Sequence, residues 1–354
     1  MFKMEVLKTS DEEWDRLVGD LELNDILYSR GYYDLHSRFL DAEAEMFTFS
    51  DGENYVIYPY LKKRINSLPF LASTSLARGK PFFDISNLEY GGPAVSGDRT
   101  IVQEFLAGFH RYCMGHRIVT EWCRLHPYLE NHRDIPGTEE VQDVFYVDLR
   151  KSAGQIFQEY EKTCRTAVRK AIKEGVEIIT TRDRKDLDEF YAMYLRTMES
   201  HGSKAFYRYS RPFFDDLFRT LRDSIQLFAA RKDGKAIAAS LFLSGRDIAH
   251  YYLSGRDPAS SGLYPNNLLL HEAILYYRER GCSIFNLGGK YGHREGLARF
   301  KEQFTRTKKS YYRLKAVHNE RVYTRFCSVY RDYLKTSGLR EGEETYFPLY
   351  RSLE

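Results

Sequence analysis

The residues best suited to chemistry lie in one segment near the end of the chain, SIFNLGGKYGHREGLARFKEQFTRTKK (residues 283–309). A strand-like run in this segment ends at Asn286, Gly288 and Gly289, and a short helical turn then presents Lys301. Glycines at the end of a strand let a ligand approach the backbone closely. A lysine beside such an opening can stabilise a developing oxyanion during acyl transfer. The competing interpretation is a solvated lysine on an amphipathic turn, and the residue types alone favour it.

Basic residues also gather on a predicted helix that opens at Ser152 and reads SAGQIFQEYEKTCRTAVRKAIKEG. At 100° per residue, its apolar residues fall on one side and four basic residues form a stripe on the other. Stripes of this kind are usually solvated helix faces. The alternative is contact with the phosphate groups of a partner, where a few cations give salt-sensitive affinity. The stripe consists of Lys162, Arg165, Arg169 and Lys173.

Several recurrent catalytic motifs are absent from the sequence. His271-Glu272 is followed by Leu275 where H-E-x-x-H requires its second histidine. There is no Walker loop, no G-x-G-x-x-G after a strand and no G-x-S-x-G elbow, so metal hydrolase, NTPase, dinucleotide oxidoreductase and α/β-hydrolase functions lose their main support. The five cysteines form no C-x-x-C pair, which argues against a zinc cluster and a disulfide framework. We therefore expect no metal site and a reducing, cytoplasmic setting.

The composition indicates a folded protein of about two domains. The chain has 354 residues, with 53 Lys+Arg against 50 Asp+Glu for a net charge of +3, and 43% of its residues are hydrophobic. These values exclude a disordered chain and give no overall nucleic-acid signature, so we expect no DNA partner. No apolar run reaches the ~18–20 residues of a membrane span, and the first residues do not read as a signal peptide.

Two stretches of the chain show the same order of elements: a hairpin, a strand, a helix and a final strand. The first runs through residues 45–125 around the turn Asp51-Gly52, and the second through residues 225–289 around Asp233-Gly234. Asp-Gly suits tight hairpin turns because their central positions need positive φ. Each stretch needs a helix laid across a mixed sheet. We therefore predict a tandem α/β protein with domains at residues 1–150 and 151–354.

Further helices are predicted outside the repeated stretches. Their segments are RKDLDEFYAMYLRTMESHG, RPFFDDLFRTLRD and ERVYTRFCSVYRDYLK, the last with aromatic residues at helical spacing. Within the repeated stretches, Gly115 and Gly281 come at the ends of the two helices, where a left-handed residue commonly closes a helix.

The motifs RTAVRKAIKEGVEI, HYYLSG, PNNLLLHEAILYYRERG, FNLGG and GLARFKEQF follow one another through the second half of the chain. Together with ENYVIYPYLKKRI and LEYGGP in the first half, this ordered set resembles the GNAT superfamily, specifically FemAB-like peptidyltransferases and related acyltransferases of cell-envelope polysaccharide pathways. The resemblance spans nearly the whole chain and is strongest over residues 150–310. It implies two GNAT-like domains, each a mixed central sheet flanked by helices, with the active site in the C-terminal domain.

The resemblance also implies roles for individual residues. Phe300 and Lys301 match the family's aromatic–Lys pair at the reacting end, where the lysine meets the tRNA terminus and the charge of the transition state. Tyr252, in HYYLSG, matches a tyrosine that lines the acceptor pocket. The family's aromatic–Lys anchor near the N-terminus has no clear counterpart here, which puts a muramyl-peptide acceptor in question more than the transfer reaction. The segment AFYRYSRPFF holds the candidates for the family's phosphate-binding arginine and its neighbours, Arg208, Tyr209 and Arg211.

The donor stays open between aminoacyl-tRNA and acyl-CoA. The best-studied members of the family take an amino acid from aminoacyl-tRNA, whereas GNAT enzymes that use acetyl-CoA bind its pyrophosphate with an R/Q-x-x-G-x-G/A loop after the fourth strand. The matching stretch here is GRDPASSGLYPNN, in which Arg256 and Gly262 have the wrong spacing and Pro258 and Pro265 remove two amide donors. The N-terminus of a helix starting near Asn267 could still hold a pyrophosphate. No bound cofactor is expected with either donor.

We therefore predict a cytoplasmic acyltransferase that forms an amide on an amino group of a nucleotide-linked or lipid-linked cell-envelope precursor. Lys301 and backbone amides near Gly288 and Gly289 would stabilise the oxyanion, and Glu121 is a weaker candidate for a site residue. The first alternative is an acyl-CoA-dependent N-acyltransferase acting on a nucleotide-linked amino sugar. The second is a non-catalytic GNAT-derived protein that binds glycans or peptides. Any association with the membrane would be peripheral, at its inner face.

Overall fold

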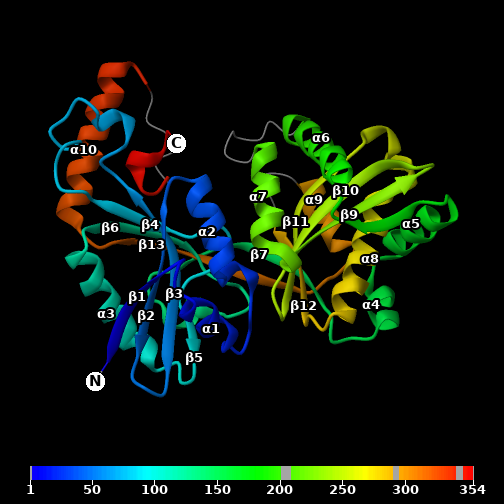
Figure 1. Cartoon of the computed structure of the whole chain (residues 1–354), viewed down its shortest axis with the longest axis horizontal. Coiled ribbons are helices and arrows are strands. Elements are labelled where there is room, and N and C mark those ends of the chain that lie inside the picture. The colour runs from blue at the N-terminus through cyan, green and yellow to red at the C-terminus, as the bar shows by residue number, and fades with distance from the viewer. Residues whose placement is uncertain (1, 201–208, 290–294, 340–345, 354) are drawn as a thin grey trace. The chain divides into compact units, whose positions relative to one another are not determined.

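The computed structural model of the chain describes residues 2–200, 209–289, 295–339 and 346–353 (Figure 1). The chain forms two compact units, each a mixed sheet flanked by helices. Unit 1 comprises Met1–Glu22, Leu27–Val141 and Tyr311–Glu354, and unit 2 comprises Leu23–Ile26 and Gln142–Ser310. The α/β class and the mixed sheets are therefore confirmed.

Unit 1 is built on a sheet in which neighbouring strands are antiparallel except for one central parallel pair, β4 with β6. Its strands, in spatial order, are β1 (Lys3–Lys8), β2 (Glu43–Ser50), β3 (Tyr55–Arg64), β4 (Phe83–Ser86), β6 (Ile118–Arg124) and β13 (Lys308–Val317), and β5 (Ala94–Ser96) pairs with β3. Its α-helices are α1 (Glu13–Gly19), α2 (Arg30–Phe39), α3 (Ile101–Gly115) and α10 (Glu320–Ser337).

The end of the chain packs into unit 1, which differs from the expected contiguous division at residue 150. From Tyr311 onward β13 pairs with β6, and α10 then lies beside the sheet of this unit (Figure 1). Burial of aromatic and aliphatic side chains explains this path, because α10 and the last residues form one apolar cluster with the strands and loops of unit 1. This cluster includes Ile65, Leu71, Val119, Phe326, Tyr330 and Tyr350.

Unit 2 repeats the same plan with its parallel pair at β11 and β12. Its strands, in spatial order, are β7 (Glu139–Asp148), β12 (Ile284–Gly289), β11 (Ile248–Arg256), β10 (Lys235–Ser244), β9 (Ile225–Lys232) and β8 (Glu177–Thr181). Its α-helices are α4 (Ala153–Glu159), α5 (Lys162–Lys173), α6 (Arg184–Ser200), α7 (Arg211–Leu221), α8 (Pro265–Glu279) and α9 (Glu295–Glu302).

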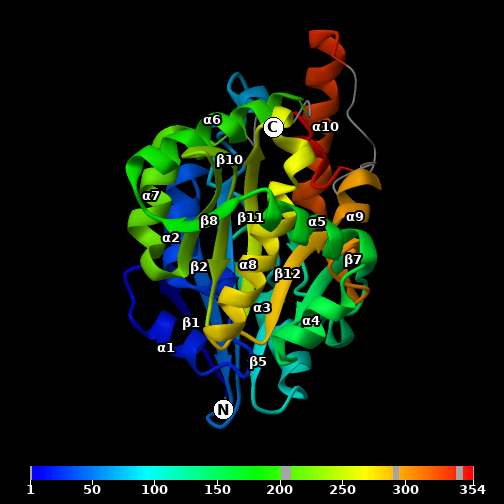
Figure 2. The same cartoon turned by 90° about the vertical axis from the view of Figure 1, so that its right-hand side faces the viewer.

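Helices cover both faces of the unit 2 sheet. Figure 2 shows α8 running along the strands with α5 beside it, and α6 and α7 pack on the other face. The main core of the unit lies under α5 and α8, where Val168 and Leu269 meet Phe228, Phe242 and Phe285. The helices predicted at residues 184–202, 211–223 and 268–281 are thus present as α6, α7 and α8, with residues 201–202 outside the described residues, and both Asp-Gly hairpins form. Asp233 and Gly234 both have positive φ, 52° and 76°, as a tight hairpin turn requires.

The prediction of one long helix from Ser152 is wrong in one respect, because the helix is interrupted at Tyr160. Ser152 does cap a helix, and its side chain pairs reciprocally with Gln155, but α4 ends after Glu159 and α5 starts anew at Lys162. Tyr160 is extended, with ψ 146°, and Arg165 reaches back to the carbonyl oxygens of Gln158 and Tyr160. The guanidinium thereby satisfies carbonyls that a continuous helix would have used internally.

One of the two predicted helix-closing glycines is confirmed. Gly281 follows α8 with φ 87°, in the left-handed region. After α3 the left-handed residue is Arg117, with φ 59°, and Gly115 is the last residue of the helix itself.

Candidate functional site

The parallel strands β11 and β12 part soon after they meet. They pair only from Ile248 to His250 on β11 and from Ile284 to Asn286 on β12. Beyond that point β11 continues against β10, while Gly288 and Gly289 pair with β7. The glycines of the FNLGG motif therefore lie where the two parallel strands are no longer bonded to each other.

Lys301 lies against these glycines. Its Nζ donates to the carbonyl oxygen of Gly289 at 2.8 Å, and the residue is only 6% exposed. Gly288 has φ 75°, and a Cβ at this position would lie 3.1 Å from the lysine Nζ. Only glycine combines this backbone conformation with this close approach. The structure thus brings together Lys301, Gly288 and Gly289, and it rules out the interpretation of Lys301 as a solvated surface residue.

Asn286 joins the same group through its side chain. Its Oδ1 accepts a hydrogen bond from the backbone amide of Gly288 at 2.8 Å, and its Nδ2 lies 3.0 Å from Nδ1 of His250. The Gly288 amide is therefore already engaged, which corrects the expectation that this amide would stabilise an oxyanion. Nζ of Lys301 carries three N–H donors, one of which meets the carbonyl oxygen of Gly289.

His250 was missed from the sequence, where the ten histidines look dispersed. Its Nε2 lies 2.9 Å from each carboxylate oxygen of Asp25. Asp25 belongs to unit 2, although it precedes the rest of that unit by more than a hundred residues. The available signal was the position of His250 at the start of HYYLSG, two residues before Tyr252, which the family resemblance singles out.

Phe300 and Tyr252 lie in the elements that carry the site. Phe300 is half-buried on α9 and packs against the main core of unit 2, with its ring centroid 5.5 Å from that of Phe304. Tyr252 is half-buried at a β-bulge, between Tyr251 and Leu253, which face Phe242 and Leu241 of β10. Bulges re-aim side chains and are frequent beside active sites.

The candidates for phosphate binding are placed less favourably. Arg208 lies outside the described residues. Tyr209 is buried and stacks on Phe213, with ring centroids 4.2 Å apart. Arg211 forms ion pairs with Asp188 and Asp215, each at 2.7 Å. Two carboxylates offset its charge, so Arg211 would have to exchange one of them to hold a phosphate.

The basic stripe on α5 divides into engaged and exposed residues. Arg165 caps α4, as described above. Arg169 is exposed, and its guanidinium carbon lies 5.3 Å from the ring centroid of Phe157. Lys162 and Lys173 are exposed. Three of the four side chains can therefore meet a phosphate without disturbing the fold.

The N-terminus of α8 offers a poor cradle for a pyrophosphate. The helix begins at Pro265, which has no amide hydrogen, and the amides of Asn267 and Leu268 both donate to the carbonyl oxygen of Tyr264. In the preceding loop the carboxylate of Asp257 accepts from the amide of Ala259. Engaged amides and a nearby negative charge both oppose a bound diphosphate.

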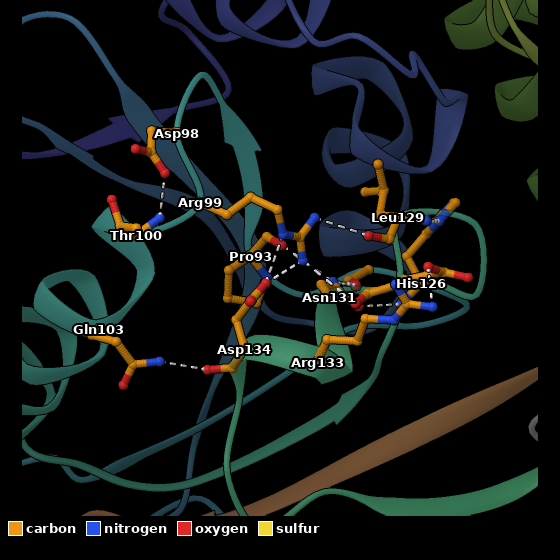
Figure 3. A network of polar contacts seen from close by, with 12 residues as sticks. Pro93, Asp98, Arg99, Thr100, Gln103, His126, Leu129, Asn131, Arg133 and Asp134 are labelled. Carbon is orange, nitrogen blue, oxygen red and sulfur yellow. Dashed lines mark hydrogen bonds and ion pairs between the residues drawn. The ribbon is translucent and has the colours of Figure 1, made fainter.

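In unit 1 the LEYGGP motif is held by the loop that follows β6. Asn131 donates from Nδ2 to the carbonyl oxygens of Gly91 and Pro93, at 2.9 and 3.1 Å. The surrounding contacts are seen in Figure 3, where Arg99 pairs with Asp134. These contacts hold the backbone of the LEYGGP motif in place. The motif therefore has a structural role within unit 1.

Glu121, the weaker candidate, is buried in unit 1. It accepts from the hydroxyl of Tyr58 at 2.6 Å and lies 3.1 Å from Nε2 of His318. Tyr58 and His318 both belong to unit 1, as Glu121 does. Among the described residues, no group of three or more His, Cys, Asp or Glu side chains could hold a metal ion, and no helix is long and apolar enough to cross a membrane.

Comparison with known proteins identifies proteins that are similar to this chain. The acetyltransferase (GNAT) domain family matches residues 158–302, a range that includes Tyr252, Asn286 and Lys301. A UDP-N-acetylmuramoylpentapeptide-lysine N(6)-alanyltransferase from Weissella viridescens is 23% identical over 176 residues, which cover 46% of this chain and 50% of that enzyme. The match thus spans about half the length of this relative.

Solved structures share the fold over most of the chain. A crystal structure of FemX superposes with a TM-score of 0.71 at 12% identity, covering 91% of this chain and 99% of FemX. A Bacteroides thetaiotaomicron protein of unknown function follows with a TM-score of 0.58 at 12% identity, covering 90% of this chain and 100% of its own. The structure of L-PGS from Bacillus licheniformis superposes with a TM-score of 0.51 at 15% identity. The match covers 88% of this chain and 93% of L-PGS.

Proposed function

We propose that this chain, which matches the acetyltransferase (GNAT) domain over residues 158–302 and shares the fold of FemX, is a FemAB-like acyltransferase of the GNAT superfamily that forms an amide on an amino group of a cell-envelope precursor. The observation that supports this function is the Lys301 group. A buried lysine Nζ lies beside two glycines at the point where β11 and β12 part. Such a donor can stabilise a negative oxygen in a site shielded from water.

The donor we propose is aminoacyl-tRNA. The amine nitrogen of the acceptor attacks the ester carbonyl carbon, and Lys301 donates to the oxygen that becomes negatively charged. The carbon–oxygen bond to the ribose then breaks, the ribose oxygen takes the proton that the amine releases, and an amide and deacylated tRNA result. The transfer is balanced without a cofactor and without a separate general base.

Other residues take supporting roles in this proposal. Tyr252 lines the acceptor pocket, and Phe300 shields the reacting end. The exposed residues of the α5 stripe contact phosphates of the tRNA. The phosphates of the acceptor bind near Tyr209 and Arg211. A cytoplasmic location and a nucleotide-linked or lipid-linked acceptor belong to the same proposal, because aminoacyl-tRNA and precursor amines meet in the cytoplasm.

An acyl-CoA-dependent N-acyltransferase acting on a nucleotide-linked amino sugar is the second candidate. The match of residues 158–302 to the acetyltransferase (GNAT) domain favours it. The engaged amides of Asn267 and Leu268 and the carboxylate of Asp257 count against it.

Parallel donor assays separate these functions. Purified protein is incubated with labelled aminoacyl-tRNA or with labelled acetyl-CoA, together with nucleotide-linked and lipid-linked precursors, and the products are identified by mass spectrometry. We expect RNase-sensitive transfer of an aminoacyl group. Transfer from acetyl-CoA alone would establish the second candidate. Tight binding of glycan or peptide with no transfer from any donor would identify a non-catalytic protein.

A further inference from the structure

Residues 23–26 form a short strap that packs within unit 2. The amide of Asn24 donates to Oδ2 of Asp247 at 2.7 Å, and Oδ1 of Asn24 accepts from the amide of Arg246 at 3.1 Å. The strap lies so close to Gly245 that a Cβ there would stand 2.7 Å from the amide nitrogen of Ile26. This contact fixes the strap directly beside the start of β11.

The strap carries Asp25 into the interior of the unit. Asp25 is 1% exposed and His250 is 6% exposed, and both carboxylate oxygens lie 2.9 Å from Nε2 of the ring. Burying a carboxylate is costly unless a hydrogen-bond donor meets it. An N–H on Nε2 of His250 is the donor that this geometry supplies.

Asn286 fixes the same proton position from the other side of the ring. The Gly288 amide can only donate, so it defines the Asn286 atom that it meets as the oxygen. The amide group of Asn286 therefore points toward Nδ1 of His250, which must accept. The neutral ring with its proton on Nε2 satisfies Asp25 and Asn286 at once.

This chain of contacts ends at the glycines that hold Lys301. Gly288, fixed through its amide, has the positive φ that brings its Cα next to the lysine Nζ, and Gly289 accepts from that Nζ. We propose that Asp25, His250 and Asn286 are positioning residues that lock the Gly288 turn and thereby set the place of Lys301. The expected effect on kcat rests on the proposed function. The position of Lys301 itself can be measured in the absence of any transfer reaction.

Replacement of two of the three residues, His250 and Asp25, tests the proposal. His250→Ala and Asp25→Ala release the Gly288 turn, and we expect kcat to fall about 10- to 100-fold while KM for the donor changes less than about threefold, since displacement of a catalytic group by ~1 Å costs about this much. Asp25→Asn keeps an oxygen facing Nε2 and should restore most of kcat. Asp84→Asn, which disturbs a comparable buried contact with Arg351 in unit 1, is the matched control for general destabilisation and should leave kcat within about twofold.

A labelling measurement keeps the two proposals distinguishable. Reductive methylation of the folded proteins, read by mass spectrometry, reports the accessibility of Lys301. We expect Lys301 to be protected in the wild type and in Asp84→Asn, and labelled at least several-fold faster in His250→Ala and Asp25→Ala. Protected Lys301 in both alanine variants, in proteins that melt cooperatively, would overturn the positioning role whatever the activity. A wild type inactive with every donor would overturn the proposed function alone.

Discussion

The Nζ atom of Lys301 lies 2.8 Å from the carbonyl oxygen of Gly289 and beside the Cα of Gly288. A lysine on α9 and two glycines at the end of β12 thereby form one group, although they belong to different elements. A carbonyl oxygen holds the ammonium in place without neutralising its charge.

Gly288→Ala should reduce both stability and transfer. A left-handed alanine costs about 1–2 kcal/mol of unfolding free energy, and its Cβ would press on the Lys301 Nζ. Gly234→Ala is the matched control, because Gly234 has nearly the same φ but nothing within 4 Å of its Cβ position. Denaturant unfolding should show a similar loss of unfolding free energy in both variants. Steady-state kinetics should show a fall of about tenfold or more in kcat for Gly288→Ala only. Equal kcat values in the two variants would contradict the role of Gly288.

Charge reversal on α5 tests the contact with tRNA. Arg169 and Lys173 are exposed, so Arg169→Glu with Lys173→Glu should leave the fold intact while weakening tRNA binding about tenfold or more at low salt. The slope of log affinity against log salt should fall by about one for each phosphate contact removed. Lys185→Glu, an exposed reversal on α6, is the control. The assay is equilibrium binding over a salt series, and identical slopes for all three proteins would refute a role for the stripe.

The two units were largely predictable, and the parts that bring distant segments together were not. Both hairpins, α3, α8 and the FNLGG strand follow from local periodicity and turn chemistry. The group formed by Gly288, Gly289 and Lys301 was predicted through the family resemblance, because the residue types alone favoured a solvated lysine. Asp25 and His250 are 225 residues apart, and a contact of that range leaves no periodic trace in the sequence. The break at Tyr160 also depends on a distant partner, since the amide of Glu161 bonds to the carbonyl oxygen of Gln303.

Stability should depend on pH through His271. Burial lowers the pKa of His271 to about 4, and its Nδ1 lies 3.3 Å from the hydroxyl of Tyr160. The unfolded chain takes up a proton at its ordinary pKa of about 6.5, and the folded protein does not until about pH 4. The stabilisation is therefore complete above about pH 6.5 and is lost as the pH falls toward 4.

His271→Phe measures that contribution. The variant keeps an aromatic ring against Phe157 and removes the titration. Chemical unfolding is measured at pH 7 and at pH 4.5. Between these two pH values the wild type should lose about 1–3 kcal/mol more unfolding free energy than the variant. Parallel losses in both proteins would show that the ring is protonated in the folded state.

The most direct test of the account is the rate of a single turnover with Lys301 replaced. Wild type, Lys301→Ala and Arg299→Ala, an exposed cation on the same helix, are mixed with labelled aminoacyl-tRNA and a precursor amine, and the amide is quantified by rapid quench. We predict a loss of about 100- to 1000-fold for Lys301→Ala, the range expected when one oxyanion donor is removed, and a rate within about twofold of wild type for Arg299→Ala. A folded Lys301→Ala protein that forms the amide at the wild-type rate would contradict the account.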